Sequence, residues 1–337
     1  MKPIQSLFTQ LTTPKKIVVT THPNPDADAL GSSLGLMHFL EGLGHTVTVV
    51  TPTDYPDFLE WMPGNDTVLA YSESLHDTIQ QKISQADYIF CLDFSSTHRL
   101  KKLEPMILEA TAEKVLIDHH LNPEEFAQYQ LWSTAAAATA ELIYDFILMM
   151  DRRSDITPEI ANCLYAGIMT DTGSFKHPST TAKVHTIVAD LIELGANINY
   201  VSREIYDTNS LSRLRFLGYA LSEKLVVKND LQVAYIVVSR DDFERFNLKS
   251  GDTEGIVNYA LSIKGIVMAT IIIEREEEVK LSFRSVGNYS VNTFANEYFN
   301  GGGHKNASGG SSTDNLEITV KRFETLIQNY KDTYRDK

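Results

Sequence analysis

The stretch Lys114-Val115-Leu116-Ile117-Asp118-His119-His120 decides how the rest of the chain is interpreted. It begins with an apolar run that is typical of a buried strand, and the run ends abruptly in polar residues. One carboxylate and two imidazoles therefore follow the carboxyl end of a predicted strand, where open α/β sheets bind ligands. A capped strand end with two surface histidines explains this stretch as well, because imidazole is common both on surfaces and in metal sites.

Other aspartates stand at the ends of predicted strands or helices. The strand predicted at 15–21 runs into His22-Pro23-Asn24-Pro25-Asp26-Ala27-Asp28-Ala29, and a helix can begin only after the second proline. A third apolar run, 87–92, ends in Asp93, and a helix opened by Pro158 ends at Asp171-Thr172-Gly173. Each aspartate alone is also explained as a helix cap or by the helix dipole. Neither explanation accounts for the histidine that precedes the first pair on the same turn.

Length and composition set the broad class of the protein. A chain of 337 residues exceeds what one hydrophobic core usually supports, so two domains are expected. The two cysteines, Cys91 and Cys163, stand in apolar surroundings that suit buried, reduced thiols. Because the sequence also has no apolar stretch long enough to span a membrane and no secretory signal, we expect a cytoplasmic protein without membrane contact.

The charge balance limits the binding partners. A formal net charge of −14 argues against a broad basic face that grips nucleic acid by releasing counterions. It leaves room for a small anionic ligand, because bound divalent ions would reverse the potential of one acidic cleft.

The order of predicted elements indicates an α/β fold. Through residues 1–198 strands alternate with helices, which predicts a domain with a parallel sheet and helices on both faces. Residues 199–221 show no clean period, and we expect the interdomain connection there. From 222 to 337 the β-rich segments 231–238, 263–273 and 279–283 predict a smaller α+β domain on an antiparallel sheet.

The second domain contains a glycine-rich segment, Gly301-Gly302-Gly303-His304-Lys305. Glycines allow the backbone to approach a ligand closely and to point amides at an anion, and the embedded histidine and lysine favour phosphate contact. A flexible loop is the alternative explanation. Arg284 follows a predicted strand and is a candidate anion clamp through its forked donors.

Together these segments resemble the DHH phosphoesterase superfamily. The resemblance rests on the histidine-proline segment at 22–29, on Asp93, on Asp118-His119-His120 and on Asp171-Thr172-Gly173, taken in order. The segment Gly301 to His304, with Arg284 upstream, resembles the DHH-associated cap domain. Length and cap are most similar to the bifunctional oligoribonucleases (nano-RNases), which also remove phosphate from 3′-phosphoadenosine-5′-phosphate. Ala27 stands where that family often has glycine, a difference of one methyl group.

The resemblance implies a role for each site residue. One metal ion would be held by His22, Asp26 and Asp93, and a second by Asp28, His119 and Asp171, with Asp93 bridging both. Such ligands suit two Mn²⁺ ions, with Mg²⁺ or Co²⁺ as alternatives. Asp118 would orient a neighbouring histidine, and His120 would contact the scissile phosphate or protonate the leaving oxygen. Substrate contacts would come from the cap residues: Arg284, Gly301, Gly302, Gly303, His304 and Lys305.

The expected activity is Mn²⁺-dependent hydrolysis of short RNA or DNA oligonucleotides and nucleoside bisphosphates. Two alternatives within enzymes stay open, a phosphodiesterase for linear or cyclic dinucleotides and a RecJ-type single-strand exonuclease. A nucleotide-sensing regulator that binds without hydrolysis is the alternative outside enzymes. The sequence does not rank these substrates, and it leaves a homodimer open.

Overall fold

The strand that ends at Asp118 lies inside a seven-stranded sheet, in the order β1-β7-β6-β5-β2-β3-β4. The structure is a computed structural model, and it describes residues 2–249 and 251–334. All neighbouring strands of this sheet run parallel, as the strand and helix alternation predicts. The strands are β1 (Lys2–Pro3), β2 (Lys16–Thr20), β3 (Thr46–Thr51), β4 (Leu69–Ala70), β5 (Tyr88–Leu92), β6 (Glu113–Asp118) and β7 (Tyr129–Trp132).

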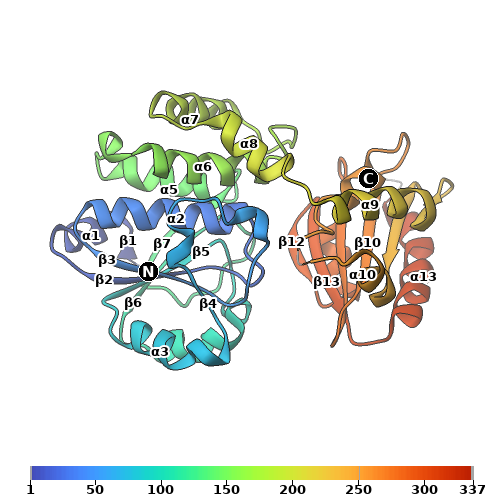
Figure 1. Cartoon of the computed structure of the whole chain (residues 1–337), viewed down its shortest axis with the longest axis horizontal. Helices are drawn as coiled ribbons and strands as arrows, with labels where there is room; N and C mark the ends of the chain where they lie inside the picture. Colours follow the sequence, from blue (N-terminus) through green and yellow to red (C-terminus); the bar gives the residue numbers. More distant parts are fainter. Residues whose placement is uncertain (1, 250, 335–337) are drawn as a thin grey trace. The chain divides into compact units, whose positions relative to one another are not determined.

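Helices cover both faces of this sheet, which confirms the predicted layering (Figure 1). One buried cluster joins the sheet to α1, α2, α5, α6, α7 and α8, and a second cluster joins the opposite face to α3 and α4. The helices are α1 (Gln5–Phe8), α2 (Ala27–Gly42), α3 (His76–Ser84), α4 (Glu104–Glu109), α5 (Thr139–Met149), α6 (Pro158–Asp171), α7 (Ala182–Glu193) and α8 (Ile198–Tyr206).

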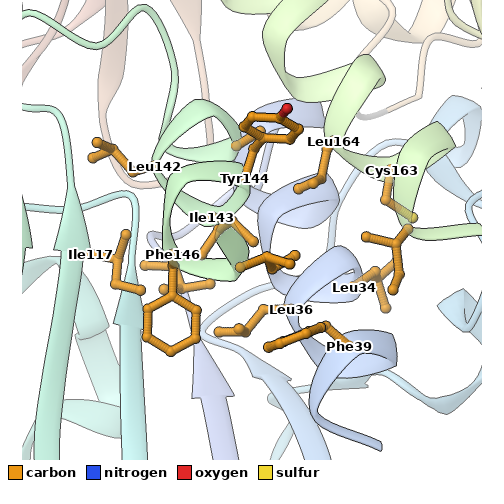
Figure 2. Close-up of a cluster of buried hydrophobic side chains, with 14 of the residues drawn as sticks. Leu34, Leu36, Phe39, Ile117, Leu142, Ile143, Tyr144, Phe146, Cys163 and Leu164 are labelled. Carbon is orange, nitrogen blue, oxygen red and sulfur yellow. The ribbon is translucent and has the colours of Figure 1, made fainter. Parts of the chain in front are cut away.

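The larger cluster holds α2, α5 and α6 against the sheet (Figure 2). Phe146 on α5 lies at its centre, with ring centroids 6.4 Å from Phe39 on α2 and 6.2 Å from Phe90 on β5. Burying each such ring stabilises the fold by roughly 1.5–3 kcal/mol. The ends of α2, α5 and β5, where polar residues lie, are therefore fixed relative to one another.

Some elements differ from the sequence-based expectation. The helix expected from residue 134 begins at Thr139, and β1, β4 and β7 were not predicted. The expected connection, 199–221, is largely helical: it contains most of α8 and all of α9 (Leu211–Tyr219). The chain divides within this segment into the units Met1–Thr208 and Asn209–Lys337. Side-chain caps from Asn197 and Ser210 begin the two helices, and these local signals were missed.

The second unit contains a six-stranded sheet in the order β12-β13-β11-β10-β9-β8. It is mixed rather than antiparallel, because β9 and β10 run parallel and two helices connect them. The strands are β8 (Leu225–Lys228), β9 (Val233–Val238), β10 (Met268–Glu274), β11 (Val279–Ser285), β12 (Gly302–His304) and β13 (Ala307–Ser312). The remaining helices are α10 (Arg240–Phe246), α11 (Ile256–Leu261), α12 (Val291–Tyr298) and α13 (Leu316–Tyr334).

Two further predictions concern the membrane and the cysteines. Within the described residues, no helix combines the length and apolar character that crossing a membrane requires. Cys91 and Cys163 are both buried free thiols, as the sequence predicts.

Candidate metal centre

The carboxyl ends of β2, β5 and β6 meet at one edge of the first sheet. These strands are direct neighbours with β5 in the middle, so their parallel pairing brings their ends together. His22 follows β2, Asp93 follows β5, and Asp118 is the last residue of β6. Asp93 has a positive φ of 64°, a conformation that is uncommon for a residue with a side chain.

Two helix ends add carboxylates to the same edge. Asp26 is the N-cap of α2, and its Oδ1 accepts the amides of Asp28 and Ala29 at 3.0 Å each. Asp28 lies in the first turn of α2 and is completely buried. Asp171 is the last residue of α6.

The first group of donor atoms comes from His22, Asp26 and Asp93, whose donor atoms lie within 4.8 Å of one another. His22 Nε2 lies 3.3 Å from Asp93 Oδ2 and 3.9 Å from Asp26 Oδ2. The other imidazole nitrogen of His22 contacts the carbonyl of Pro23 at 3.0 Å, which holds the ring orientation.

The second group comes from Asp28, His119 and Asp171, again within 4.8 Å of one another. His119 Nε2 lies 3.3 Å from Asp171 Oδ2 and 3.9 Å from Asp28 Oδ2. The same nitrogen lies 3.4 Å from Asp93 Oδ1. Asp93 therefore turns one carboxylate oxygen toward each imidazole.

Asp118 and His120 form a third pair beside these groups. His120 Nδ1 lies 2.8 Å from Asp118 Oδ1, whereas it lies 3.7 Å from Asp93 Oδ1. Asp118 is completely buried, so its carboxylate holds the His120 ring in one orientation.

The electrostatics of the site fit a bound cation. Burial raises the pKa of Asp28 well above its usual range, and the charges of Asp93 and Asp171 add to this effect. Burial likewise raises the pKa of Asp171 to about 8, although His119 opposes the shift. Burial would lower the pKa of His119, but the hydrogen bond to Asp93 and the charge of Asp171 raise it to about 11. A divalent ion strongly stabilises the ionised form of carboxylates that disfavour one another's ionisation in this way. Carboxylate oxygen together with imidazole nitrogen is also a donor set that such ions accept.

Comparisons with known proteins agree with this arrangement. Residues 16–168 match the model of the DHH family, N-terminal domain, and residues 229–335 match the DHHA1 domain. The chain is 30% identical over 295 residues to the bifunctional oligoribonuclease and PAP phosphatase NrnA of Thermus thermophilus, covering 87% of this chain and 83% of that protein. The chain belongs to the DHH family.

Two other relatives cover nearly all of both chains. The protein of the same name from Bacillus subtilis is 26% identical over 319 residues, covering 94% of this chain and 96% of that protein. The crystal structure of an exopolyphosphatase-related protein from Bacteroides fragilis superposes with a TM-score of 0.91 at 39% identity, covering 98% of this chain and 96% of that chain. The family and these relatives identify the chain as a hydrolase of the phosphoesterase type.

Residues that support the DHH centre were missed in the sequence. The backbone amides of Thr139 and Ala140 donate to Asp28 at 2.7 and 2.9 Å, so Asp28 caps the start of α5. The Thr139 hydroxyl donates to Asp93 Oδ1 at 2.9 Å. Gly167 on α6 leaves room for the carboxylate, because a Cβ there would lie 2.6 Å from Asp28 Oδ1. These contacts join distant segments, and no local sequence signal marks them.

Arg99 was also missed, although its loop follows Asp93 directly. It lies in the 3-10 helix η5 (Thr97–Leu103), which is anchored by the buried Leu100 and Leu103. Burial and the charge of Arg99 both oppose protonation of His22, whose pKa is nevertheless raised by Asp93 and Asp26. The half-buried Arg99 forms an ion pair with no carboxylate of the described residues.

The glycine-rich segment of the DHHA1 unit forms part of a hairpin, and not the flexible loop that was the alternative explanation for its glycines. β12 pairs with β13, and His304 stands opposite Ala307, which in turn stands opposite Arg284 on β11. Arg284 and His304 therefore lie at the same level of the sheet, on either side of Ala307. Gly303 has a φ of 136°, and a Cβ there would lie 2.7 Å from the Ala307 carbonyl, so strand packing alone explains this glycine. Lys305 donates to Asn288 Oδ1 at 3.1 Å.

Proposed function

We propose that this protein hydrolyses phosphoester bonds of short oligoribonucleotides and removes the 3′-phosphate of 3′-phosphoadenosine-5′-phosphate, with two Mn²⁺ ions bound. The observation that carries the proposal is the position of Asp93, whose Oδ2 lies 3.3 Å from His22 and whose Oδ1 lies 3.4 Å from His119. A carboxylate whose two oxygens face two separate groups of donors, each with an imidazole and a carboxylate, is suited to bridge two cations. The names of the relatives from Thermus thermophilus and Bacillus subtilis support the substrate class.

The donor groups divide between two ions. His22, Asp26 and Asp93 would hold the first, and Asp28, His119 and Asp171 the second, with Asp93 shared. When bound, the ions would supply Lewis acidity for the attacking water and the phosphate, and Mg²⁺ or Co²⁺ are alternatives to Mn²⁺.

Asp118 and His120 would transfer a proton to the leaving oxygen. Because Asp118 Oδ1 lies 2.8 Å from His120 Nδ1, the carboxylate favours the tautomer with hydrogen on Nδ1. The opposite nitrogen, Nε2, can then carry a proton to the leaving oxygen when the ring is protonated. His120 thus contributes to the reaction without being a metal ligand.

Cationic side chains and glycine backbone would contact the substrate. Arg284, His304 and Lys305, with the backbone of Gly301 to Gly303, would bind phosphate and sugar oxygens. Arg99 would add a guanidinium beside the metal centre. A chain with a net charge of −14 has little basic track for a polymer, so we expect the best substrates to have about two to five nucleotides. We also propose a cytoplasmic location, because both cysteines are free thiols.

The test measures turnover by the purified protein with Mn²⁺. The substrates are a diadenylate, a pentamer and a 20-nucleotide RNA, 3′-phosphoadenosine-5′-phosphate, cyclic di-AMP and tripolyphosphate. We expect the highest kcat/KM for the short RNAs, turnover of the bisphosphate, and loss of all activity with a chelator that Mn²⁺ reverses. Processive digestion of the 20-nucleotide strand would favour the RecJ-type alternative. Full activity in protein shown to be free of metal would refute the mechanism.

A further inference from the structure

Trp132 stands at the carboxyl end of β7, immediately beside the metal centre. It pairs in register with Asp118 on β6. Its indole Nε1 donates to the backbone carbonyl of His120 at 2.7 Å. This hydrogen bond satisfies the polar edge of the ring and fixes it against the chain segment that carries His119 and His120.

The Trp132 side chain stays 40% exposed although it is the largest apolar group at this edge. Leu121, which follows His120 in the chain, is 42% exposed. Within the part of the chain that the structure describes, the indole of Trp132 stacks on no other ring and on no cation. The other tryptophan, Trp61, differs, because it packs edge-on against Tyr200 with ring centroids 5.5 Å apart.

We propose that Trp132 is the stacking platform for a nucleobase of the substrate. The inference rests on the proposed function, since it places a base next to the phosphate that the metal centre would bind. A nucleobase is a flat π-system joined by one sugar to the phosphate, and an aromatic face with a fixed edge binds it without ordering a mobile side chain. Leu121 would contact the same base or its ribose.

This role would determine specificity. Every base has a π-face, so stacking on Trp132 favours nucleotides over base-free phosphate chains with little preference among bases. Removing the indole should therefore weaken nucleotide binding about 5- to 150-fold, the range measured for the loss of one stacked base. The step at phosphorus should keep its rate, because the hydrogen bond of the indole ends on the backbone carbonyl of His120 and not on a side chain of the metal centre.

The first experiment compares Trp132→Ala and Trp132→Phe with wild-type protein, each loaded with Mn²⁺ and checked for metal content and thermal midpoint. The substrates are a diadenylate and the same dinucleotide without its bases. We expect Trp132→Ala to raise KM for the diadenylate about 5- to 150-fold, with kcat and the abasic KM little changed. Trp132→Phe keeps an aromatic face and should recover most of the loss. Equal KM changes on both substrates, or a phenylalanine variant as weak as the alanine variant, would overturn the proposal.

The second experiment needs no turnover, so its result is independent of the proposed hydrolysis. In a Trp61→Phe variant, Trp132 is the remaining tryptophan of the chain. Stacking of AMP should quench its fluorescence in a saturable manner, whereas ribose 5-phosphate should leave the emission unchanged. Quenching by ribose 5-phosphate to the same extent would show that the indole is covered by protein on ligand binding, and absence of quenching by AMP would equally refute stacking. A wild-type protein that cleaves no nucleotide would remove the proposed function while leaving this binding result intact.

Discussion

Replacing Gly167 with alanine tests whether the metal centre depends on the close approach of α6 to Asp28. A Cβ at this position would lie 2.6 Å from Asp28 Oδ1, 2.8 Å from Ala140 Cβ and 3.1 Å from Asp28 Cα. Non-bonded carbon atoms normally approach to about 3.5–4.0 Å, so the new methyl group must displace these neighbours by roughly 1 Å. Asp28 and Ala140 are both completely buried, and no flexible surface side chain can absorb the clash.

The size of the effect follows from two opposing contributions. Overpacking a buried site costs about 1–3 kcal/mol, whereas alanine in place of glycine within a helix returns about 1 kcal/mol. We therefore expect the free energy of unfolding to fall by up to about 2 kcal/mol. Displacement would also lengthen the hydrogen bonds from Thr139 and Ala140 to Asp28, now 2.7 and 2.9 Å, and lower Mn²⁺ affinity about tenfold or more.

The assay combines urea unfolding of the metal-free protein with titration of Mn²⁺ binding. Gly218→Ala is a matched control, because this glycine lies in α9 and a Cβ there would meet no described atom within 4 Å apart from the neighbouring backbone of its own helix. That control should gain about 0.5–1 kcal/mol and bind Mn²⁺ like wild type. A Gly167→Ala protein that behaves like the control in both measurements would show that close approach at Gly167 does not position Asp28.

Four other substitutions test separate parts of the proposal. His119→Ala should lower Mn²⁺ occupancy, whereas His120→Ala should keep both ions and lower kcat about 10²- to 10⁴-fold; equal metal loss in the two variants would refute the assignment. Thr139→Val removes the 2.9 Å hydrogen bond to Asp93 and should weaken Mn²⁺ binding about 10- to 100-fold, and unchanged affinity in a metal titration would contradict this role. Arg284→Ala should raise KM for every short substrate roughly tenfold or more at unchanged metal content, so an unaltered KM would remove Arg284 from the substrate site.

The elements that carry the centre were predictable because their signals are local. An apolar run that ends in a polar residue predicted β5 and β6, and the two prolines before Asp26 predicted where α2 begins. Parallel strands bind ligands at their carboxyl ends, so the pattern placed Asp93 and Asp118 each at a strand end of this kind. The resemblance to the DHH family added the ligand sets that spacing could not provide.

The supporting contacts were not predictable because they join segments far apart in the chain. The start of α5 was placed five residues early, since Ala138 offers no side-chain cap and the cap comes instead from Asp28, 111 residues away. The hairpin of β12 and β13 was missed for another reason. Glycine serves ligand approach and close strand packing equally well, and composition does not distinguish the two.

Asp28 connects the stability of the fold to the chemistry of the site. Each of its oxygens accepts an amide from the first turn of α5, and a carboxylate offers about four lone-pair positions, so capacity remains for a cation on the side of His119. Burial and the charges of Asp93 and Asp171 oppose ionisation of Asp28, whereas the two amides and the positive end of the α5 dipole favour it. The start of α5 thus helps to keep the buried carboxylate of Asp28 available to a metal ion. This contact also explains the position of the helix start: α5 begins where Asp28 of α2 caps its first amides, and not at a cap residue of its own segment.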